Sequence, residues 1–153
     1  MANEHHYALH LQWNGDHTRT YDEYTREHVI RIVGKPDLVA TADPIFRGDA
    51  AQHNPEDLLL AALSSCHMLT YLALCARARI DVRSYRDQAT GTLLLTPDGG
   101  GRFTEVVLHP EVIIADDRML AKAREFHLAA HKYCFIANSV NFPVRCEPTV
   151  GAA

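Results

Sequence analysis

The sequence predicts an α+β fold in which helices pack on a mainly antiparallel sheet. Three observations support this: short segments with alternating apolar residues, a long apolar helix, and a second helix that precedes a last short strand. Their order along the chain is strands, helix, strands, helix, strand, which is typical of the α+β class. The length of 153 residues suits one domain over residues 1–153, and no repeat or linker divides the chain.

The first part of the chain is expected to form strands. Tyr7 to Trp13 places apolar side chains on one face of a strand, and Glu27 to Val33 is expected to form a second strand. A turn at 34–37 leads to a short extended piece from Leu38 to Thr41. The segment that follows, up to Asn54, is polar and rich in turn residues.

A long helix is predicted from Asn54 to about Arg79. Asn54 is a favourable N-cap and Pro55 suits the first helical position. Residues 58–76 contain no Asp, Glu, Lys or Arg, so by length the helix could cross a bilayer. Its capped start and its central polar residues, such as His67, favour a helix buried in a core or an oligomer interface instead. We therefore expect no membrane span.

The second half of the chain repeats this alternation of strands and helix. Strands are expected over 89–96 and 102–114, and Pro110 suggests a bulge or an edge position in the latter. Asp116 can cap a second helix that runs to about Tyr133. The segment 141–148 is expected to form a short last strand.

Composition limits the possible partners and the compartment. The net charge is −4 without a long basic run, which argues against nucleic acid as a partner. The first residues lack the basic start and apolar run of a secretory signal, so a cytoplasmic location is expected. In that reducing compartment the cysteines are not expected to form structural disulfides. They could be core residues, metal ligands or redox-active thiols.

Two cysteines, Cys66 and Cys75, lie on the long helix. Nine residues separate them, so they point to opposite sides of the helix and lie about 13.5 Å apart along it. They cannot form a disulfide with each other. Any partner of Cys66 must come from elsewhere, and Cys134, at the end of the second helix, is a candidate. Burial of each thiol as a small core residue is the alternative.

A metal site is a further alternative. His127, His131 and Cys134 follow one another at i, i+4 and i+7 on one face of the second helix, and Cys66 and His67 could add ligands. The spacing between the two histidines is compatible with zinc. Such spacings are common by chance in a chain with ten histidines.

Several motifs together resemble the OsmC/Ohr family of thiol-dependent peroxidases. They are "FRGD", "NPEDLLLAALSSCHM", "AHKYCFIANSV" and "VRCEP", and the resemblance extends from Tyr7 to about Pro148. The form "CHM" and "CFIANSV" is closer to the OsmC-like branch. The resemblance implies an OsmC-like fold, with two central helices in an intertwined homodimer. It also implies reduction of organic hydroperoxides and, less efficiently, of hydrogen peroxide.

The resemblance also implies roles for four residues. Cys66 matches the peroxidatic cysteine and Cys134 the resolving cysteine, so a Cys66–Cys134 disulfide is expected in turnover. Arg47 matches the arginine that organises the thiolate, and Glu56 matches the glutamate that pairs with this arginine. An external dithiol, often a lipoylated protein in this family, would reduce the disulfide. No metal or organic cofactor is implied.

Helix geometry adds a constraint on these roles. Glu56 and Cys66 are ten residues apart, or about 15 Å along a straight helix. Either the helix bends, or Glu56 acts only near the N-terminus of the helix, or the Arg47–Glu56 pair meets Cys66 of the other subunit. We favour the last as a hypothesis. His67, Cys75 and Cys146 have no family role that we can assign. A thiol-bearing sensor or binding protein on the same fold, without turnover, is the main alternative function.

Overall fold

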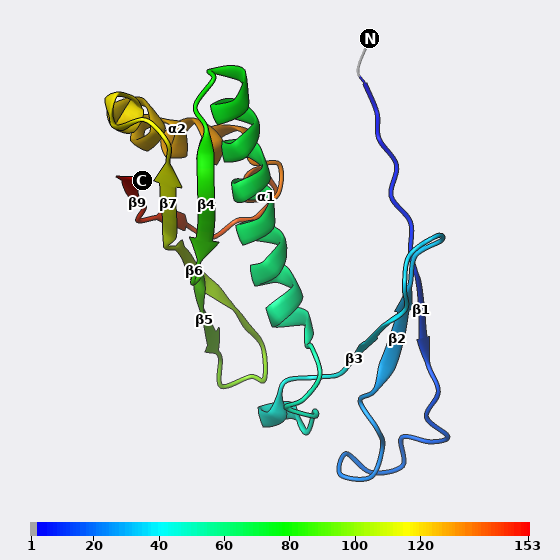
Figure 1. Ribbon diagram of the computed structural model, residues 1–153. Coiled ribbons are helices and arrows are strands. Elements are labelled where there is room, and N and C mark those ends of the chain that lie inside the picture. The colour runs from blue at the N-terminus through cyan, green and yellow to red at the C-terminus, as the bar shows by residue number, and fades with distance from the viewer. Residues whose placement is uncertain (1–2) are drawn as a thin grey trace. The chain divides into compact units, whose positions relative to one another are not determined.

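The computed structural model describes residues 3–153 and forms two compact units, Met1–Leu59 and Leu60–Ala153 (Figure 1). Each unit is described below by itself. The long helix α1, Pro55–Arg77, begins in the first unit and belongs mainly to the second. The prediction of a single domain over residues 1–153 stays a prediction.

The first unit contains a three-stranded antiparallel sheet in the order β1-β2-β3. Its strands are β1 (His10–Trp13), β2 (His28–Arg31) and β3 (Leu38–Ala40). The two predicted strands and the predicted extended piece are thus confirmed, although β1 begins three residues later than expected. The predicted turn between β2 and β3 is also present, with Gly34 in the left-handed region at a φ of 79°.

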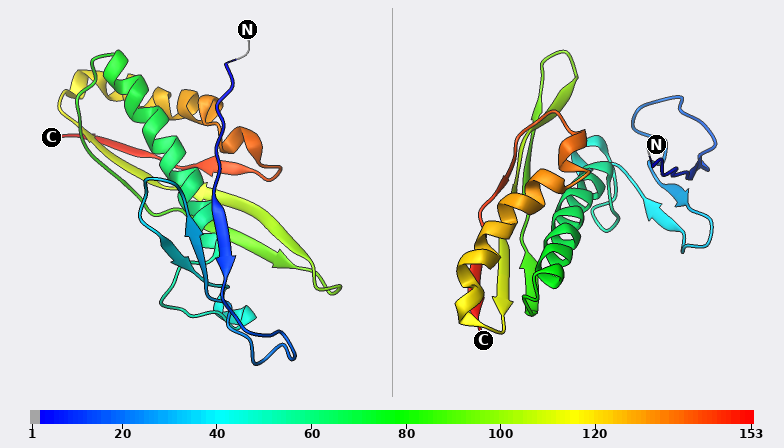
Figure 2. Two further views of the ribbon diagram at one scale, coloured as in Figure 1. Left: turned by 90° about the vertical axis from the view of Figure 1, so that its right-hand side faces the viewer. Right: turned by 90° about the horizontal axis from the view of Figure 1, so that it is seen from above.

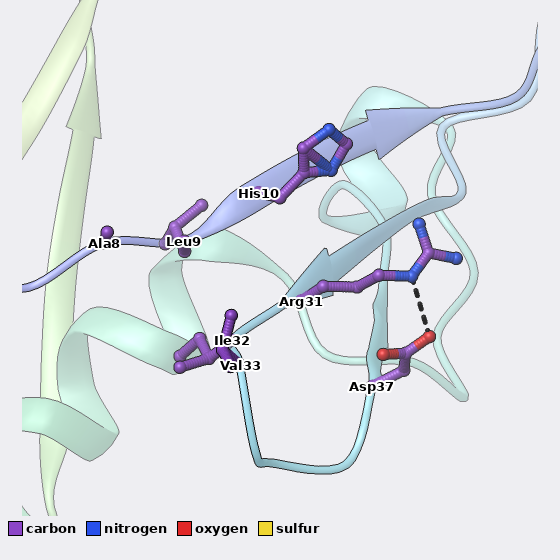
Figure 3. Close-up of a pocket in the computed structure, with 7 residues that line it drawn as sticks. All are labelled: Ala8, Leu9, His10, Arg31, Ile32, Val33 and Asp37. Atoms are coloured by element: carbon purple, nitrogen blue, oxygen red, sulfur yellow. Dashed lines mark hydrogen bonds and ion pairs between the residues drawn. The ribbon is translucent and has the colours of Figure 1, made fainter.

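The apolar face predicted for the first strand is exposed within this unit. Tyr7 is 93% exposed, and Leu9, Leu11 and Trp13 are 60%, 58% and 39% exposed. Beside these residues lies an open hollow of about 530 Å³ (Figure 3). It is lined by Ala8, Leu9, His10, Arg31, Ile32, Val33 and Asp37. Arg31 Nε donates to Asp37 Oδ2 at 2.9 Å, which ties β2 to the turn before β3.

The start of α1 is capped as the sequence predicts. Asn54 Oδ1 accepts a hydrogen bond from the Asp57 amide at 2.9 Å, and the Asp57 carboxylate accepts one from the Asn54 amide at 3.3 Å. This reciprocal arrangement satisfies two backbone donors at the helix start. The helix ends at Arg77, two residues before the predicted end, and Arg79 follows with a φ of 59°.

The second unit contains two three-stranded sheets, with orders β4-β7-β9 and β5-β6-β8. Its strands are β4 (Val82–Asp87), β5 (Thr90–Leu95), β6 (Gly101–Leu108), β7 (Pro110–Ile114), β8 (Val144–Cys146) and β9 (Thr149–Ala152). Each sheet combines one antiparallel pair, β4 with β7 or β5 with β6, with a parallel last strand. The sheets are therefore mixed but rich in antiparallel pairing.

Two of these strands were not expected, and one was expected to be continuous. The two unexpected strands are β4 and β9. The predicted strand over 102–114 is divided at His109. Pro110 begins β7, the central strand of its sheet, so the expected bulge or edge position is wrong. A strand's first position tolerates proline because its missing N–H removes no internal ladder bond there.

The second helix is α2, Leu120–Tyr133, which confirms the predicted helix up to its end. A 3-10 turn, η2 (Asp117–Met119), precedes it, and Asp116 Oδ1 accepts from the Arg118 amide at 3.0 Å. Asp116 therefore caps this turn, not α2 itself. After α2, a further 3-10 turn, η3, covers Ala137–Ser139.

The core of the second unit lies where the helices meet the β4-β7-β9 sheet. Its buried residues are Tyr71, Cys75, Ile80, Val112, Ile114, Ala123, Ala130 and Val150. In both views of Figure 2 α1 and α2 lie next to each other. The buried residues of α1 recur every fourth position, at Leu63, His67, Tyr71 and Cys75. By length and composition α1 could cross a membrane, but this face packs against protein.

Candidate functional site

The structure brings Cys66 and Cys134 together. Cys66 lies in the middle of α1, and Cys134 is the residue at which α2 ends. The two side chains lie close enough for hydrogen bonding by Cys134 to lower the pKa of Cys66. Cys66 is partly accessible, whereas Cys134 is buried. The two cysteines come from helices that are far apart in sequence, so the fold itself creates the thiol pair.

The environment of Cys66 favours its thiolate. Burial raises the pKa of this thiol. Hydrogen-bonding groups together lower it by more than burial raises it; they are the Ile136 backbone, the Cys134 side chain, the Phe135 backbone and Thr70. The net result is a pKa below the ordinary value for cysteine. Thr70 Oγ1 also donates to the carbonyl oxygen of Cys66 at 2.8 Å, which fixes the threonine beside the thiol. Cys66 is therefore suited to act as a nucleophile.

The environment of Cys134 favours its protonated thiol instead. Burial raises the pKa of Cys134 to about 11, although the Ala137 amide, which donates to its sulfur at 3.5 Å, lowers it in part. The hydrogen bond to Cys66 raises it further, because this bond needs Cys134 to keep its proton. The pair thus consists of one thiol that ionises readily and one that remains a proton donor.

The other two thiols have no such arrangement. Cys75 is buried in the core, and burial raises its pKa. Cys146 lies on β8, and burial, followed by the charges of Asp87 and Glu147, raises its pKa to about 12. All four cysteines are free in this structure.

Comparison with known proteins identifies the family of this chain. Residues 48–149 match the family described as "OsmC-like protein". The chain belongs to the OsmC-like family. An OsmC-like protein of unknown function from Vibrio cholerae has a similar structure, with a TM-score of 0.86 and 32% identity. That comparison covers 95% of this chain and 100% of the Vibrio chain.

More distant solved structures share the OsmC-like fold. An organic hydroperoxide resistance protein OsmC from Legionella pneumophila is 17% identical over 97% of this chain and 99% of its own, with a TM-score of 0.69. The organic hydroperoxide resistance protein OhrB of Bacillus subtilis is 21% identical over 94% and 98%, with a TM-score of 0.64. No curated protein matches the chain. The predicted family and α+β fold are thus confirmed.

Within this OsmC-like chain, Arg47 and Glu56 lie in the first unit. Arg47 follows the 3-10 turn η1 (Pro44–Phe46) in the left-handed region, with a φ of 67°. Its Nη2 pairs with Asp22 Oδ1 at 2.8 Å, so its carboxylate partner here is Asp22 and not the predicted Glu56. The connection between β1 and β2 supplies Asp22, which the spacing of the motifs could not reveal. Glu56 Oε2 is buried without a hydrogen-bond partner among residues 3–153.

The potential metal ligands that lie close together in the structure are not the group that the sequence predicted. Among the described residues, the group of potential ligands comprises His67, His127 and Cys146, with one ligand atom from each lying within 4.8 Å of the others. His131 is exposed and is not part of the group, because α2 turns this residue away from the core. Cys134 instead contacts Cys66.

Sequence reasoning missed this cluster because its members come from three elements. His67 lies on α1, His127 on α2 and Cys146 on β8. The two imidazole rings are stacked, with centroids 5.4 Å apart and an angle of 8° between their planes. Tyr71 stacks on the His127 ring at 4.0 Å. Burial lowers the pKa of both histidines to about 4, so both rings are uncharged at neutral pH.

Proposed function

We propose that this OsmC-like protein is a thiol-dependent peroxidase that reduces organic hydroperoxides. The observation that carries the proposal is the unequal thiol pair, in which Cys134 donates to Cys66 and the pKa of Cys66 is lowered. Membership of the family and the names of two neighbours, both organic hydroperoxide resistance proteins, support a redox role.

The chemistry divides into three balanced steps. The Cys66 thiolate attacks one oxygen of the hydroperoxide, the O–O bond breaks, and an alcohol leaves after taking up one proton. Cys66 is then a sulfenic acid. The thiol of Cys134 condenses with it, which forms a Cys66–Cys134 disulfide and releases water. An external dithiol exchanges with this disulfide, restores both thiols and becomes a disulfide itself.

The position of Cys134 supports the second step. Its side chain is near enough to Cys66 to influence the pKa of that thiol, so Cys134 is the nearby thiol that we expect to condense with the sulfenic acid. Cys134 lies at the end of α2, where the backbone has left the helical conformation (φ −69°, ψ 111°). A residue at a helix end can adjust more easily than one inside the helix when the sulfur–sulfur bond forms.

Apolar groups near the thiols favour an organic substrate. Phe135, adjacent to Cys134, is 81% exposed, and Leu69, adjacent to Thr70, is 60% exposed. Apolar surface of this kind can bind the organic tail of a hydroperoxide and withdraw it from water. Hydrogen peroxide has no such tail, so we expect it to be the poorer substrate.

We further propose that the protein acts as a homodimer. The apolar face of β1 is exposed within its unit, and so are the small or apolar residues of α1 at every fourth position: Ala61, Ser65, Leu69 and Ala73. Exposed apolar area of this extent is costly in a monomer. Small side chains on α1 would let the same helix of a second copy approach closely.

Arg47 and Glu56 are proposed to serve the thiol site of such a dimer. Glu56 holds a buried carboxylate oxygen without a partner, and the Arg47 side chain is 55% exposed. An exchange of Asp22 for Glu56 would satisfy that oxygen with a bidentate ion pair. The guanidinium could then stabilise the Cys66 thiolate and the alkoxide that leaves.

The test is steady-state reduction of cumene hydroperoxide with dihydrolipoamide as the electron donor. The wild-type protein should turn over, and the Cys66→Ser variant should fall to the uncatalysed rate. The Cys134→Ser variant should retain a first oxidation but lose efficient recycling. Cys75→Ala is the matched control, because Cys75 is a core thiol outside the pair, and its rate should be close to that of the wild type.

Two outcomes would contradict the proposal. If all four proteins give the background rate, a sensing or binding role for Cys66 replaces the peroxidase. If Cys66→Ser is as active as the wild type, another thiol carries the reaction. Light scattering tests the dimer separately: a mass near 17.1 kDa for the chain, with full activity, would exclude it.

A further inference from the structure

We propose that His67, His127 and Cys146 form a binding site for a divalent transition metal ion, with Zn²⁺ as the ion that the donor set fits. The site is separate from the Cys66–Cys134 pair and does not depend on the peroxidase proposal. Each of the three residues provides one donor atom of a type that zinc prefers, imidazole nitrogen or thiolate sulfur.

Two of the three distances between the donor atoms match those around a tetrahedral ion, and the third, from His127 Nδ1 to Cys146 Sγ, is below 4.8 Å. His67 Nε2 lies 3.1 Å from His127 Nδ1 and 3.6 Å from Cys146 Sγ. With zinc–nitrogen bonds of about 2.0–2.1 Å and a zinc–sulfur bond of about 2.3 Å, the ligand atoms are separated by about 3.3 Å for two nitrogens and about 3.6 Å for nitrogen and sulfur. The donor atoms are therefore spaced like zinc ligands, and binding would require the near-parallel His67 and His127 rings to rotate so that their nitrogen lone pairs meet at the ion.

A single proton cannot bridge all the donor atoms of this cluster, whereas a metal ion can bind all three. His67 Nε2 faces both His127 Nδ1 and Cys146 Sγ, and one proton can bridge only one of these two contacts. A cation at the centre would instead accept a lone pair from all three atoms. The two rings are also 98–99% buried, so water does not supply the missing partners from bulk solvent.

The surrounding residues hold the ligands in place and favour a positive charge. The His127 ring stacks with the rings of both Tyr71 and His67. The carboxylate of Asp87 favours positive charge at His67, and Ser64 Oγ and the His109 amide both donate to this carboxylate. A Zn²⁺ ion, the Cys146 thiolate and Asp87 together have no net charge, which lowers the cost of burying the ion.

Binding has a defined proton balance. The ion forms bonds to His67, His127 and Cys146, and the Cys146 thiol loses one proton to solvent. Three protein ligands leave a fourth tetrahedral position for water or another small ligand, as in exchangeable and catalytic zinc sites. No change of redox state is involved.

Titration of the metal-free, reduced protein with Co²⁺ tests the site directly, since a Co²⁺–thiolate bond gives a charge-transfer band in the near ultraviolet. We expect one ion per chain and displacement of Co²⁺ by Zn²⁺. Cys146→Ser should abolish the charge-transfer band. His127→Gln should weaken binding by more than the roughly 10- to 100-fold that loss of a supporting group around a metal site costs.

The matched control is the double variant Cys66→Ser/Cys134→Ser, which removes the neighbouring thiols and keeps the three ligands. It should bind Co²⁺ with the wild-type stoichiometry and spectrum. Far-ultraviolet circular dichroism of every variant verifies folding, and Zn²⁺ should raise the unfolding temperature of the wild type and of the double variant only. The proposal is overturned if the wild type shows no thiolate band, or if the double variant loses the band while Cys146→Ser retains it.

Discussion

Cys66 and His67 are neighbours on α1, yet they belong to two different sites. Cys66 is hydrogen-bonded to Cys134, and His67 contacts His127 and Cys146. Both sites combine residues of α1 with residues from later in the chain. The first contains a thiol whose pKa is lowered, and the second contains one, Cys146, whose pKa is raised to about 12.

The pKa values of Cys66 and Cys146 differ because of the hydrogen-bond donors around Cys66, and not because of burial alone. Burial is the largest influence on both thiols and raises the pKa of each. Around Cys66 it is outweighed by donors from the segment after α2, the backbone of Ile136 and Phe135 among them. Around Cys146 the nearby charges of Asp87 and Glu147 are negative and act in the same direction as burial. The same residue type is thus prepared for attack in one site and kept protonated in the other.

The largest expected effect is a difference in alkylation rate between these two thiols. Iodoacetamide reacts with the thiolate, and the pKa of Cys66 is lowered whereas that of Cys146 is raised to about 12, so Cys66 should be labelled at least about 100-fold faster than Cys146 at pH 7.5. Mass spectrometry of digested samples taken over time measures both rates. In denaturant the two rates should become similar. Equal rates in the folded protein would show that the donors around Cys66 have no effect.

A second prediction concerns the stability of the metal-free protein at low pH. His67 and His127 have pKa values of about 4 in the fold, against an ordinary 6.5. Below about pH 6.5 the unfolded chain therefore takes up protons that the folded chain does not. Stability should be complete above pH 6.5 and fall towards pH 4, with a slope of up to about 1.4 kcal/mol per pH unit for each ring.

Urea unfolding at several pH values, with a chelator present, measures this slope. Asp87 raises the pKa of His67 and His131 lowers it, so both belong to the same titration. His127→Gln provides the comparison, because it removes one of the two buried rings and should reduce the slope. An unchanged slope in this variant would contradict the assigned role of the buried pair.

A third, smaller effect is expected at the thiol pair. Cys134→Ala removes the side-chain donor to Cys66, which should raise the Cys66 pKa, because Cys134 is among the groups that lower it. Cys134→Ser is the matched variant, because its hydroxyl can still donate, and the Cys66 pKa should stay closer to that of the wild type. The pH dependence of Cys66 alkylation gives each value. Identical pKa values for the two variants would exclude the Cys134 hydrogen bond as a cause.

The smallest effect is expected for Thr70→Val, which keeps the shape of the side chain and removes its hydroxyl. Thr70 is the weakest of the groups that lower the Cys66 pKa. The Cys66 pKa should rise by less than it does in Cys134→Ala, measured by the same alkylation profile. A rise larger than that of Cys134→Ala would reverse the order of the two donors.

The sequence predicted the local features of the fold better than its sheets. Asn54 and Pro55 marked the start of α1 because capping depends on adjacent residues. The strand β4 was missed because its register shifts between Val82 and Ser84, which interrupts the alternation of apolar side chains. The strand β9 is only four residues long and contains Gly151, so it has little local signal.

The thiol pair and the cluster of His67, His127 and Cys146 also differ in whether the sequence could predict them. The thiol pair could be predicted because the motifs around Cys66 and Cys134 resemble a known family. The second site could not, because 60 residues separate His67 from His127 and 79 separate His67 from Cys146. Only the packing of α1, α2 and β8 brings these residues together. Spacing on one helix suggested His131 instead, and that residue is exposed.

The most direct test of the central claim is a single oxidation of the reduced, metal-free protein with one equivalent of cumene hydroperoxide, followed by alkylation and peptide mapping. We predict the loss of two free thiols and one linked peptide that joins Cys66 to Cys134, with Cys75 and Cys146 still reduced. A Cys66–Cys146 disulfide, or a Cys66 that remains a free thiol, would contradict the account.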